Sequence, residues 1–409
     1  MLTVADALAA LAAEVVRLPR AVVDLPDALG LVLAEDAVSD ADSPPFDKAL
    51  MDGYAVRSTD IVAGRVSLRV IEQVMAGQVP HQPLHTGEAT QIMTGAPLPA
   101  GADAVVPVEL TQRGDSRDNL VSIDGPLVKP GANVLWRGES MKAGGLVIPA
   151  GRRLRAQELG CLAELGRHRV AVYPAARVAV LATGDELVPV HETPGPGQIR
   201  NSNETLLVAQ LRQVGAVPLP LGIARDERQC LKDRILTGLA QDMLLLSGGV
   251  SAGQLDLVPA VLAEIGVRQV FHKVRVKPGQ PIWFGVYNRL ADAGQRPPCF
   301  VFGLPGNPVS SMVCFEIFVR TALRRLMGIE PAASESFRAE LASDFVKART
   351  RPTWHPAQVQ RTPRGFTVTT VPWVGSADLC ATAQANALVL FPPGEEVLRA
   401  GEEVEVFPL

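Results

Sequence analysis

Two glycine-containing segments carry the clearest chemical signal in this sequence. Residues 247–256 read Ser-Gly-Gly-Val-Ser-Ala-Gly-Gln-Leu-Asp, and residues 303–310 read Gly-Leu-Pro-Gly-Asn-Pro-Val-Ser. Each segment follows a short apolar run typical of a strand and precedes a run typical of a helix. Glycines at such a junction leave backbone amides accessible, and the start of the following helix adds positive partial charge. The two segments therefore predict a site for a phosphorylated or oxyanionic ligand.

Acidic residues follow two other strand-like runs of the same region. Asp185 follows the run at 177–182 after Thr183 and Gly184, and Asp226 follows the run at 217–222. Carboxylates beside an anion site are suited to holding Mg²⁺, which prefers oxygen ligands and bridges to phosphate oxygens. The alternative is that Asp185 and Asp226 only cap turns and helices, and Asp256 has the same alternative as a helix N-cap.

Cationic side chains recur at alternate positions in the segment Lys273-Val-Arg-Val-Lys277-Pro-Gly-Gln-Pro. In a strand, alternate side chains share one face, so Lys273, Arg275 and Lys277 could together meet a dianion. A solvated sheet face is the alternative, and we favour it for Arg275. We do not favour it for Lys277, because the Lys-Pro-Gly context is a constrained turn.

The second glycine segment combines features of a helix start with features of a ligand site. Asn307 is a suitable N-cap, and Pro308 stands where a helix accepts its first proline. Leu304-Pro305-Gly306 is compact and keeps side chains away from a ligand that approaches the amides, while Ser310 can add a hydroxyl.

Two compact turns stand out nearer the N-terminus, Asp52-Gly53-Tyr54 and Thr94-Gly95-Ala96-Pro97. Asp-Gly and Gly-Ala-Pro are common turn sequences, so the residues alone favour a structural role for both.

The elements that must position these residues change along the chain. Apolar residues at helical spacing over 7–16, with Thr3 and Asp6 as a capping pair, predict an N-terminal helix. Residues 60–150 alternate short β-branched runs with turn residues and predict an all-β segment. A helix is expected again at 156–165. We expect it to pack with the N-terminal helix, with the β segment inserted between them.

The region from 177 onwards predicts a parallel α/β sheet, because strand-like and helix-like runs alternate. In such sheets ligands bind outside the carboxyl ends of the strands, which is where both glycine segments fall. We expect strands at 177–182, 217–222, 243–246, 268–276, 282–287 and 299–303, and helices over 207–214, 227–240 and 309–327. Beyond residue 328, short strands and turns predict a small β-barrel or sandwich.

Composition limits the class of protein. Charged residues make up 20% of the 409 residues and the net charge is −4, so no overall basic field attracts nucleic acid or anionic membranes. No apolar segment is long enough to span a membrane. The cysteines are scattered and lack the spacing of a zinc site, which predicts reduced core thiols and a cytoplasmic location. They are Cys161, Cys230, Cys299, Cys314 and Cys380.

Taken together and in this order, several motifs resemble those of the molybdopterin molybdotransferase family, to which the C-terminal domain of gephyrin belongs. The motifs are Met51–Val56, Ile92–Pro97, Ala182–Leu187, Gly197–Asn203, Ser247–Ser251, Lys277-Pro-Gly and Gly303–Ser310. The resemblance implies an elongated homodimer. It also implies a helical domain (1–42 and 140–172), an inserted β domain (43–139), an α/β molybdopterin-binding domain (173–328) and a C-terminal β-barrel (329–409).

The implied reaction joins molybdate to adenylylated molybdopterin, releases AMP and leaves molybdenum on the dithiolene. The implied site lies where the α/β domain faces the inserted domain of the partner subunit. Residues implied to act there are Asp52, Thr94, Asp185, Glu186 and Asp226, with Asp185, Glu186 and Asp226 holding Mg²⁺. Those implied to hold molybdopterin are Ser247, Gly248, Gly249, Ser251, Asp256, Pro305, Gly306, Asn307 and Pro308. Lys273, Lys277, Ser310 and Ser376 are implied to hold molybdate.

The resemblance also implies protein partners, namely a molybdopterin adenylyltransferase and the apo-molybdoenzymes that receive the cofactor. Two alternatives remain. One is a molybdopterin adenylyltransferase, which shares the α/β domain but lacks the N-terminal segment and the barrel. The other is a non-catalytic scaffold that binds peptides, as gephyrin's related domain does. The identity of the product would separate these functions.

The sequence departs from the family pattern at several motif positions. Gly138-Glu139-Ser140 replaces a common Gly-Glu-Asp, Gln254 replaces a usual Glu, and Gln280 replaces a frequent Lys. His355-Pro356 occupies a stretch that often supplies Arg, and Ala49-Leu50 alter the residues before Met51. Fewer acids and cations leave open whether the chain prefers molybdate or tungstate, or is a weakened paralogue.

Overall fold

The computed structural model describes residues 1–61, 64–113, 119–249, 257–289, 297–333, 335–346, 350–394 and 397–409. Contacts between Cα atoms divide the chain into two compact units. The first unit comprises residues 1–34, 151–155 and 169–409, and the second comprises residues 35–150 and 156–168. The finer domain boundaries implied by the resemblance stay a prediction.

A six-stranded sheet in the order β17-β14-β18-β21-β20-β19 forms the centre of the first unit. The neighbours from β17 to β21 run parallel, and β20 is antiparallel to both β21 and β19. This confirms the predicted α/β fold. The strands are β14 (Arg177–Thr183), β17 (Val217–Ala224), β18 (Met243–Ser247), β19 (Arg268–His272), β20 (Trp283–Tyr287) and β21 (Cys299–Leu304).

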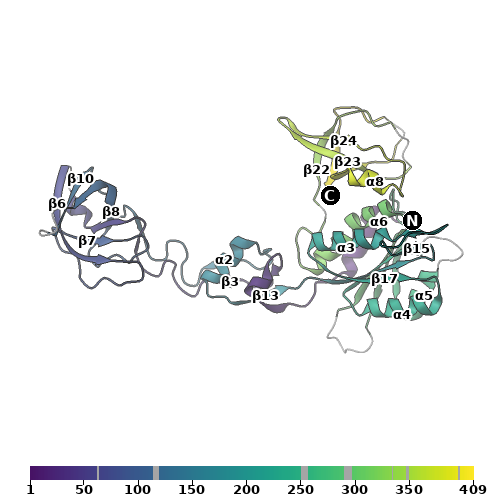
Figure 1. Cartoon of the computed structure of the whole chain (residues 1–409), viewed down its shortest axis with the longest axis horizontal. Helices are drawn as coiled ribbons and strands as arrows, with labels where there is room; N and C mark the ends of the chain where they lie inside the picture. The colour runs from purple at the N-terminus through teal and green to yellow at the C-terminus, as the bar shows by residue number, and fades with distance from the viewer. Residues whose placement is uncertain are drawn as a thin grey trace. The chain divides into compact units, whose positions relative to one another are not determined.

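Helices cover both faces of this sheet, with α3 (Ser202–Val214) and α6 (Pro308–Cys314) on one face and α4 (Arg228–Leu239) and α5 (Leu257–Ile265) on the other (Figure 1). Alternate residues of β14 point to opposite faces. Val178 and Val180 accordingly belong to the apolar cluster that contains α3 and α6, while Ala179 and Leu181 belong to the cluster that contains α4 and α5. Burial on both faces explains why β14 and β18 read as nearly continuous apolar runs.

The predicted helix at 309–327 is interrupted. It consists of α6, a π-helical turn η4 (Phe315–Val319) and α7 (Arg320–Leu326). Within the turn, the buried Glu316 carboxylate accepts both guanidinium hydrogen bonds of Arg320, at 2.5 and 2.9 Å, and one from Gln210 Nε2 at 2.7 Å. Burying this charge is tolerated because it is paired and hydrogen-bonded.

The N-terminal helix α1 (Val4–Glu14) begins at the predicted capping box, in which Thr3 and Asp6 exchange hydrogen bonds. Its apolar residues Ala7 and Leu11 pack into the α/β core, where α1 contacts β19 and α7. The expected partner, the helix at 156–165, forms as α2 (Ala156–Glu164) but belongs to the second unit. The α/β core buries the apolar face of α1, and the packing of the two helices against each other stays a prediction.

Two small sheets complete the α/β part of the first unit. One has the order β1-β13-β2 and the other pairs β15 with β16. The strands of these sheets are β1 (Ala21–Asp24), β2 (Val32–Leu33), β13 (Arg169–Tyr173), β15 (Leu187–Val188) and β16 (Ile199–Arg200). A 3-10 turn, η1 (Leu25–Ala28), follows β1.

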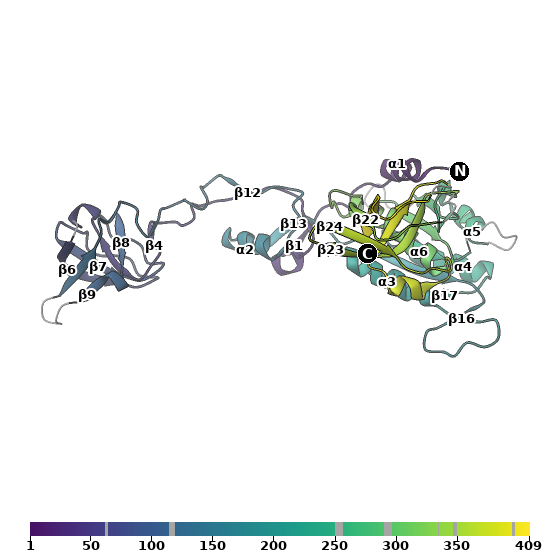
Figure 2. The same ribbon diagram turned by 90° about the horizontal axis from the view of Figure 1, so that it is seen from above.

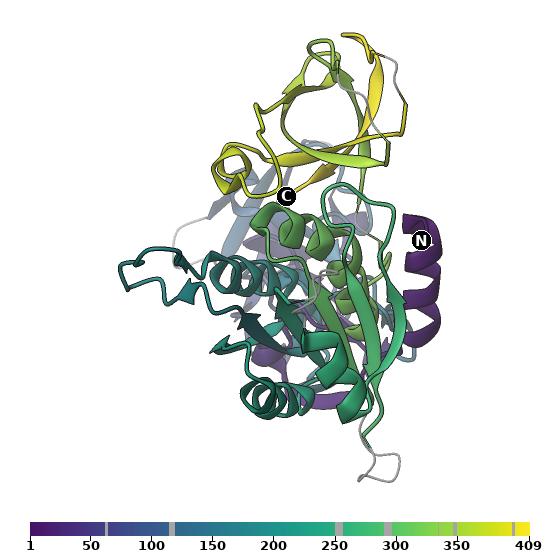
Figure 3. The same ribbon diagram turned by 90° about the vertical axis from the view of Figure 1, so that its right-hand side faces the viewer.

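The predicted C-terminal β-barrel is present and closes in the order β22-β24-β23-β25-β26 (Figure 3). Trp354 of β23 and Leu388 of β25 join the apolar cluster of the α/β core, so the barrel packs onto that core. The elements are β22 (Phe337–Leu341), β23 (Thr353–Thr362), β24 (Gly365–Thr370), α8 (Leu379–Ala383), β25 (Ala387–Phe391) and β26 (Glu403–Pro408).

The second unit contains a six-stranded sheet in the order β8-β5-β7-β6-β10-β9 (Figure 2). This confirms the inserted β segment. Its elements besides α2 are β3 (Ala37–Val38), β4 (Lys48–Ala49), β5 (Gly53–Val56), η2 (Ser58–Asp60), β6 (Gly64–Val74), β7 (Glu88–Ile92), β8 (Ala104–Pro107), η3 (Val108–Leu110), β9 (Thr111–Arg113), β10 (Leu120–Gly125), β11 (Val134–Leu135) and β12 (Leu146–Ile148).

The cysteines are free, as expected, but they are not all core residues. Cys299 and Cys314 are buried, and burial raises the pKa of the Cys299 thiol to about 12. Cys380, in α8, is exposed, which corrects the expectation of a core position. No helix formed by the described residues has the length and apolar character needed to cross a membrane.

Candidate functional site

The carboxyl edge of the central sheet collects most of the predicted site residues. Asp226 follows β17, Asp185 follows β14, Gly248 follows β18 and Pro305 follows β21, in the order of the strands across the sheet. Lys273 follows β19 at the far end. With roughly 4.8 Å between neighbouring strands, this edge runs for roughly 24 Å from Asp226 to Lys273. Carboxylates thus lie at one end, glycine loops in the middle and a cation at the other end.

At the acidic end, the loops after β14 and β17 are tied together. Asp226 N donates to Asp185 Oδ1 at 3.2 Å, and Arg225 Nη1 donates to the Asp185 carbonyl at 2.8 Å. Gly184 has φ +146°, and a Cβ there would lie 2.4 Å from Glu186 Oε2. No three His, Cys, Asp or Glu side chains of the described residues gather into a metal site, so Asp185, Glu186 and Asp226 do not form one cluster.

In the middle, the loop after β18 approaches the backbone of its neighbours closely. Gly248 has φ +95°, and a Cβ there would lie 2.5 Å from the Thr183 carbonyl oxygen. Gly248 N also donates to the Leu304 carbonyl at 3.1 Å. Only glycine fits this position, since both the backbone conformation and the space exclude a side chain. Ser251 and Asp256, also predicted here, lie outside the described residues.

The sequence interpretation did not single out Asn203, which joins the two glycine loops. Its Nδ2 donates to Ser247 Oγ and to the Gly306 carbonyl, both at 2.7 Å, and the residue is only 9% exposed. Its Oδ1 is buried without a partner among the described residues, as is the Oγ1 of Thr183. The available signal was an amide side chain in the first turn of a predicted helix, at the end of the motif Gly197–Asn203.

The segment after β19 is not the strand that alternation predicted. β19 ends at His272, and Lys273 adopts a left-handed conformation with φ +65°. The chain then turns back, with Val274 N donating to the Gln280 carbonyl at 3.0 Å. Arg275 is exposed, as favoured from the sequence, while Lys273 and Lys277 are half-buried. The predicted strand at 268–276 is therefore wrong beyond His272, because a tight turn replaces it, and the shared face of the three cations stays a prediction.

This turn nevertheless lies beside two other residues predicted to bind an oxyanion. A Cβ on Gly279 would lie 3.5 Å from the Ser310 carbonyl oxygen, which places the turn against α6. Val309 N donates to the Ser376 carbonyl at 3.1 Å. Lys277, Ser310 and Ser376 therefore belong to neighbouring segments.

Asn307 is the N-cap residue of α6, and Pro308 is its first residue, as predicted. The Asn307 side chain does not cap the helix, however. Its Nδ2 donates to Ser376 Oγ at 2.9 Å and so connects the loop after β21 to the barrel segment that carries Ser376.

The two turns of the second unit come together. Thr94 donates to Asp52 Oδ1 from both its backbone N and its Oγ1, each at 2.7 Å. These hydrogen bonds from the backbone and hydroxyl of Thr94 lower the pKa of the Asp52 carboxyl. Gly53 is required next to it, because a Cβ there would lie 1.9 Å from the Val106 carbonyl oxygen.

The structure assigns two of the departures from the family pattern to local packing. His355 is 6% exposed and lies among the rings of Phe345, Trp373 and Phe391 in the barrel. Ser140, which stands where the pattern has Asp, is exposed, and its backbone N donates to the Ser43 carbonyl at 3.0 Å within the second unit. Gln254 lies outside the described residues.

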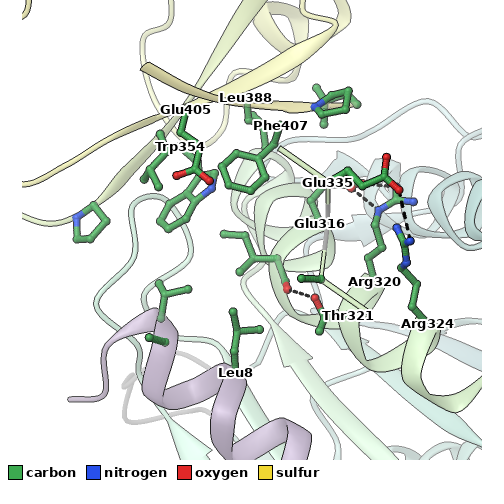
Figure 4. Close-up of a pocket in the computed structure, with 18 of the residues that line it drawn as sticks. Leu8, Glu316, Arg320, Thr321, Arg324, Glu335, Trp354, Leu388, Glu405 and Phe407 are labelled. Carbon is green, nitrogen blue, oxygen red and sulfur yellow. Dashed lines mark hydrogen bonds and ion pairs between the residues drawn. The ribbon is translucent and has the colours of Figure 1, made fainter. Parts of the chain in front are cut away.

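A separate cavity of about 740 Å³ lies between α1, the η4–α7 segment and the barrel (Figure 4). Leu8, Trp354, Leu388 and Phe407 form its apolar wall, and the Glu316–Arg320 pair borders it. None of the predicted site residues lines this cavity.

Comparison with known proteins identifies all parts of the chain. Three family models match: "MoeA N-terminal region (domain I and II)" over residues 2–166, "Probable molybdopterin binding domain" over 179–325, and "MoeA C-terminal region (domain IV)" over 338–409. The chain is similar to the molybdopterin molybdenumtransferase of Staphylococcus epidermidis, with 33% identity over 94% of this chain and 90% of the relative. It is 34% identical to that of Nostoc sp., over 95% of this chain and 88% of the relative.

A solved structure extends this similarity to the fold. The molybdopterin biosynthesis moea protein from Pyrococcus horikosii matches with a TM-score of 0.81 and 32% identity, covering 100% of this chain and 99% of that one. The match includes the N-terminal region and the barrel, which an adenylyltransferase was expected to lack. The chain therefore belongs to the molybdopterin molybdenumtransferase family of transferases.

Proposed function

We propose that this protein joins molybdate to adenylylated molybdopterin, releasing AMP and forming molybdenum cofactor. In this reaction water adds across the phosphoanhydride bond, which breaks to give AMP and molybdopterin phosphate. The two dithiolene sulfurs replace an oxygen ligand of molybdate, and that oxygen leaves as water with the two thiol protons. The observation that carries the proposal is the order of groups along the carboxyl edge of the sheet. An elongated ligand with phosphates and an adjoining oxyanion requires that sequence of acidic, glycine-lined and cationic positions.

Within this site we propose that the loops 247–249 and 305–308 hold molybdopterin phosphate through the backbone N–H groups of Gly249, Gly306 and Asn307. Pro305 and Pro308 have no N–H and only shape the loop, and Gly248 N donates to the Leu304 carbonyl. Lys273, Lys277, Ser310 and Ser376 hold molybdate. The chain contributes positioning and charge neutralisation, which suffice for phosphoryl chemistry without a covalent nucleophile on the protein.

A magnesium ion fits the acidic end, since Mg²⁺ is usually held by one or two carboxylates together with substrate phosphates. Asp185 and Asp226 are joined by a hydrogen bond at 3.2 Å and are exposed, so they supply that donor set without a third carboxylate. The ion would neutralise phosphate charge. Glu186 is the remaining candidate ligand.

We further propose a homodimer in which the Asp52–Thr94 pair of one copy serves the site of the other. The lowered pKa of Asp52 supports an ionised carboxylate there, held in place by Thr94. The supply of adenylylated molybdopterin requires an adenylyl-transferring enzyme, and the product requires molybdenum-free enzymes as acceptors. Free, scattered cysteines support a cytoplasmic location.

Release of AMP by the purified protein tests this function. The protein is supplied with adenylylated molybdopterin and Mg²⁺, and molybdate and tungstate are titrated separately. We expect AMP release that depends on molybdate. Preference for tungstate would assign the departures at 254 and 280 to the choice of oxyanion, whereas no release with either oxyanion from folded protein would refute the proposal.

Asn203→Asp is expected to raise the concentration of adenylylated molybdopterin needed for half-maximal AMP release by about 10- to 100-fold. The substitution keeps the side chain's size but replaces the N–H donors to Ser247 and Gly306 by acceptors, so the two glycine loops lose their link. Steady-state kinetics and a melting curve measure the effect.

The neighbouring Asn201→Asp provides a matched control. Asn201 Oδ1 accepts a hydrogen bond from Glu204 N at 3.3 Å, which aspartate preserves as an equally good helix cap, and the Asn201 side chain contacts the Glu204 carboxyl but neither glycine loop. Unchanged kinetics for Asn203→Asp, or an equal loss in Asn201→Asp, would contradict the positioning role of Asn203.

A further inference from the structure

Arg225 is an exposed arginine at the acidic end of the sheet edge. It follows β17 directly and precedes Asp226, and its Nη1 donates to the Asp185 carbonyl at 2.8 Å. The strand that leads to Asp185, β14, lies between β17 and β18 in the sheet. The hydrogen bond therefore draws the guanidinium away from its own strand and towards the glycine loop that follows β18.

The end of β14 is in close contact with that glycine loop. A Cβ on Gly248 would lie 2.5 Å from the Thr183 carbonyl oxygen, and a Cβ on Gly249 would lie 2.9 Å from Thr183 Oγ1. Thr183 is two residues before Asp185. Because neighbouring strands are roughly 4.8 Å apart, a phosphate group between the Asp185 loop and the glycine loop can be contacted from both sides.

The charge of Arg225 is anchored but not neutralised. The hydrogen bond to a backbone carbonyl uses one of the five N–H donors of the guanidinium. Within the described part of the chain, no carboxylate lies within ion-pair distance of Arg225. By contrast, the cations Arg228 and Lys232 of α4 both pair with Glu264. Arg225 therefore keeps its charge and most of its N–H donors available for an anion.

We infer that Arg225 binds the adenylyl phosphate, which is the phosphate that leaves with AMP. In adenylylated molybdopterin this phosphate lies on the opposite side of molybdopterin phosphate from the dithiolene. The proposed function places the dithiolene at the cationic end, with molybdate, and molybdopterin phosphate at the glycine loops. The adenylyl phosphate then lies towards the acidic end, beside Arg225. The inference rests on the proposed function and adds the contact for its leaving group.

The part that Arg225 plays in the reaction is electrostatic. Water supplies the oxygen and the protons of the two products, and breaking the phosphoanhydride bond leaves additional negative charge on the phosphate oxygens. A guanidinium that contacts two oxygens of one phosphate stabilises this charge without exchanging a proton. Arginine suits this role because it stays protonated and its planar N–H groups match the phosphate geometry.

Arg225→Ala is expected to weaken the binding of AMP by about 10-fold or more, the loss expected for a charge-assisted hydrogen bond. Equilibrium dialysis of AMP in the presence of Mg²⁺ measures this binding without turnover. The rate of AMP release from adenylylated molybdopterin should fall as well. The molybdate concentration for half-maximal release should change by less than about 3-fold, because molybdate binds at the other end of the edge.

Two further variants separate the charge of Arg225 from its hydrogen bond to Asp185. Arg225→Gln keeps an N–H donor but loses the charge, and it should bind AMP as weakly as Arg225→Ala. Arg225→Lys keeps the charge and should bind AMP within about 5-fold of the wild type. The matched control is Arg234→Ala, which should bind AMP normally. Arg234 is an exposed arginine of α4 whose Nη1 likewise donates to a backbone carbonyl, that of Leu221, at 3.0 Å.

Two failures can be distinguished. If the wild type releases no AMP with either molybdate or tungstate, the proposed function is refuted. If the wild type is active but Arg225→Ala keeps both its AMP binding and its rate, the assignment of Arg225 is overturned. The assignment is also overturned if Arg225→Lys restores neither property, or if Arg225→Gln restores both, because Arg225 would then only join the two loops.

Discussion

Asp226→Ala is expected to lower molybdate-dependent AMP release by about 1000-fold, because it removes a carboxylate that would hold the ion neutralising the phosphates. The fold should survive, since the hydrogen bond that joins the two acidic loops comes from the backbone N of Asp226 and goes to Asp185 Oδ1. Rates over a range of Mg²⁺ concentrations measure the effect. The variant should need more Mg²⁺ than the wild type, because Asp185 remains.

The control for Asp226→Ala is Asp233→Ala, which removes an exposed carboxylate of α4 that accepts a hydrogen bond from Gln229 Nε2 at 2.9 Å. That variant should retain the full rate. Normal AMP release from Asp226→Ala would show that Asp226 has no role at the site and would favour the alternative that it only caps a turn. A fall in the melting temperature of more than a few degrees would instead indicate damage to the sheet edge.

The second large effect is expected when two inactive variants are mixed, because mixed dimers should regain AMP release. Asp52→Asn disables the second unit of a chain, and Asp226→Ala disables the α/β edge. If each site of a symmetric dimer combines the α/β edge of one copy with the second unit of the other, a mixed dimer contains one intact site. The isolated mixed dimer should therefore recover about half of wild-type AMP release.

Co-expression of differently tagged variants and isolation of the mixed dimer measure this recovery. The double variant Asp52→Asn/Asp226→Ala, mixed with the wild type, is the control, because both substitutions then reside on one chain and each site of a mixed dimer is disabled. Recovery no greater than in the separate variants would mean that the two residues act within one copy or that Asp52 is structural. The short hydrogen bonds from Thr94 to Asp52 make a structural role the alternative outcome.

Much of the first unit could be predicted from local sequence. The near-continuous apolar runs at 177–183 and 243–247 identified buried parallel strands, since a strand covered on both faces needs no polar alternation. The glycines at 248 and 249 identified a close-approach turn, because only glycine tolerates their positive φ values beside the Thr183 carbonyl. The parallel order then placed Asp185 and Asp226 at one edge.

The errors share a physical cause. The alternation of Lys273, Arg275 and Lys277 is compatible with both a strand and a tight turn, and the turn forms because Val274 and Gln280 pair across it. The apolar stripe of α1 predicts that this face of the helix is buried, but it does not predict which surface buries it. In the structure that surface belongs to the α/β core. A local pattern specifies which side chains prefer to be buried, and the contact itself depends on the rest of the chain.

By itself the sequence determined the alternation of strands and helices and the glycine and acidic positions at the sheet edge, since each depends on backbone conformation or on short-range periodicity. The family followed separately, from the resemblance of its ordered motifs. Only the tertiary structure decided the contacts between distant segments. Asn203 joins residues 247 and 306, Ser376 meets Asn307, and Arg351 reaches Gln280. These polar contacts are separated by tens of residues, and no local preference of either partner specifies the other.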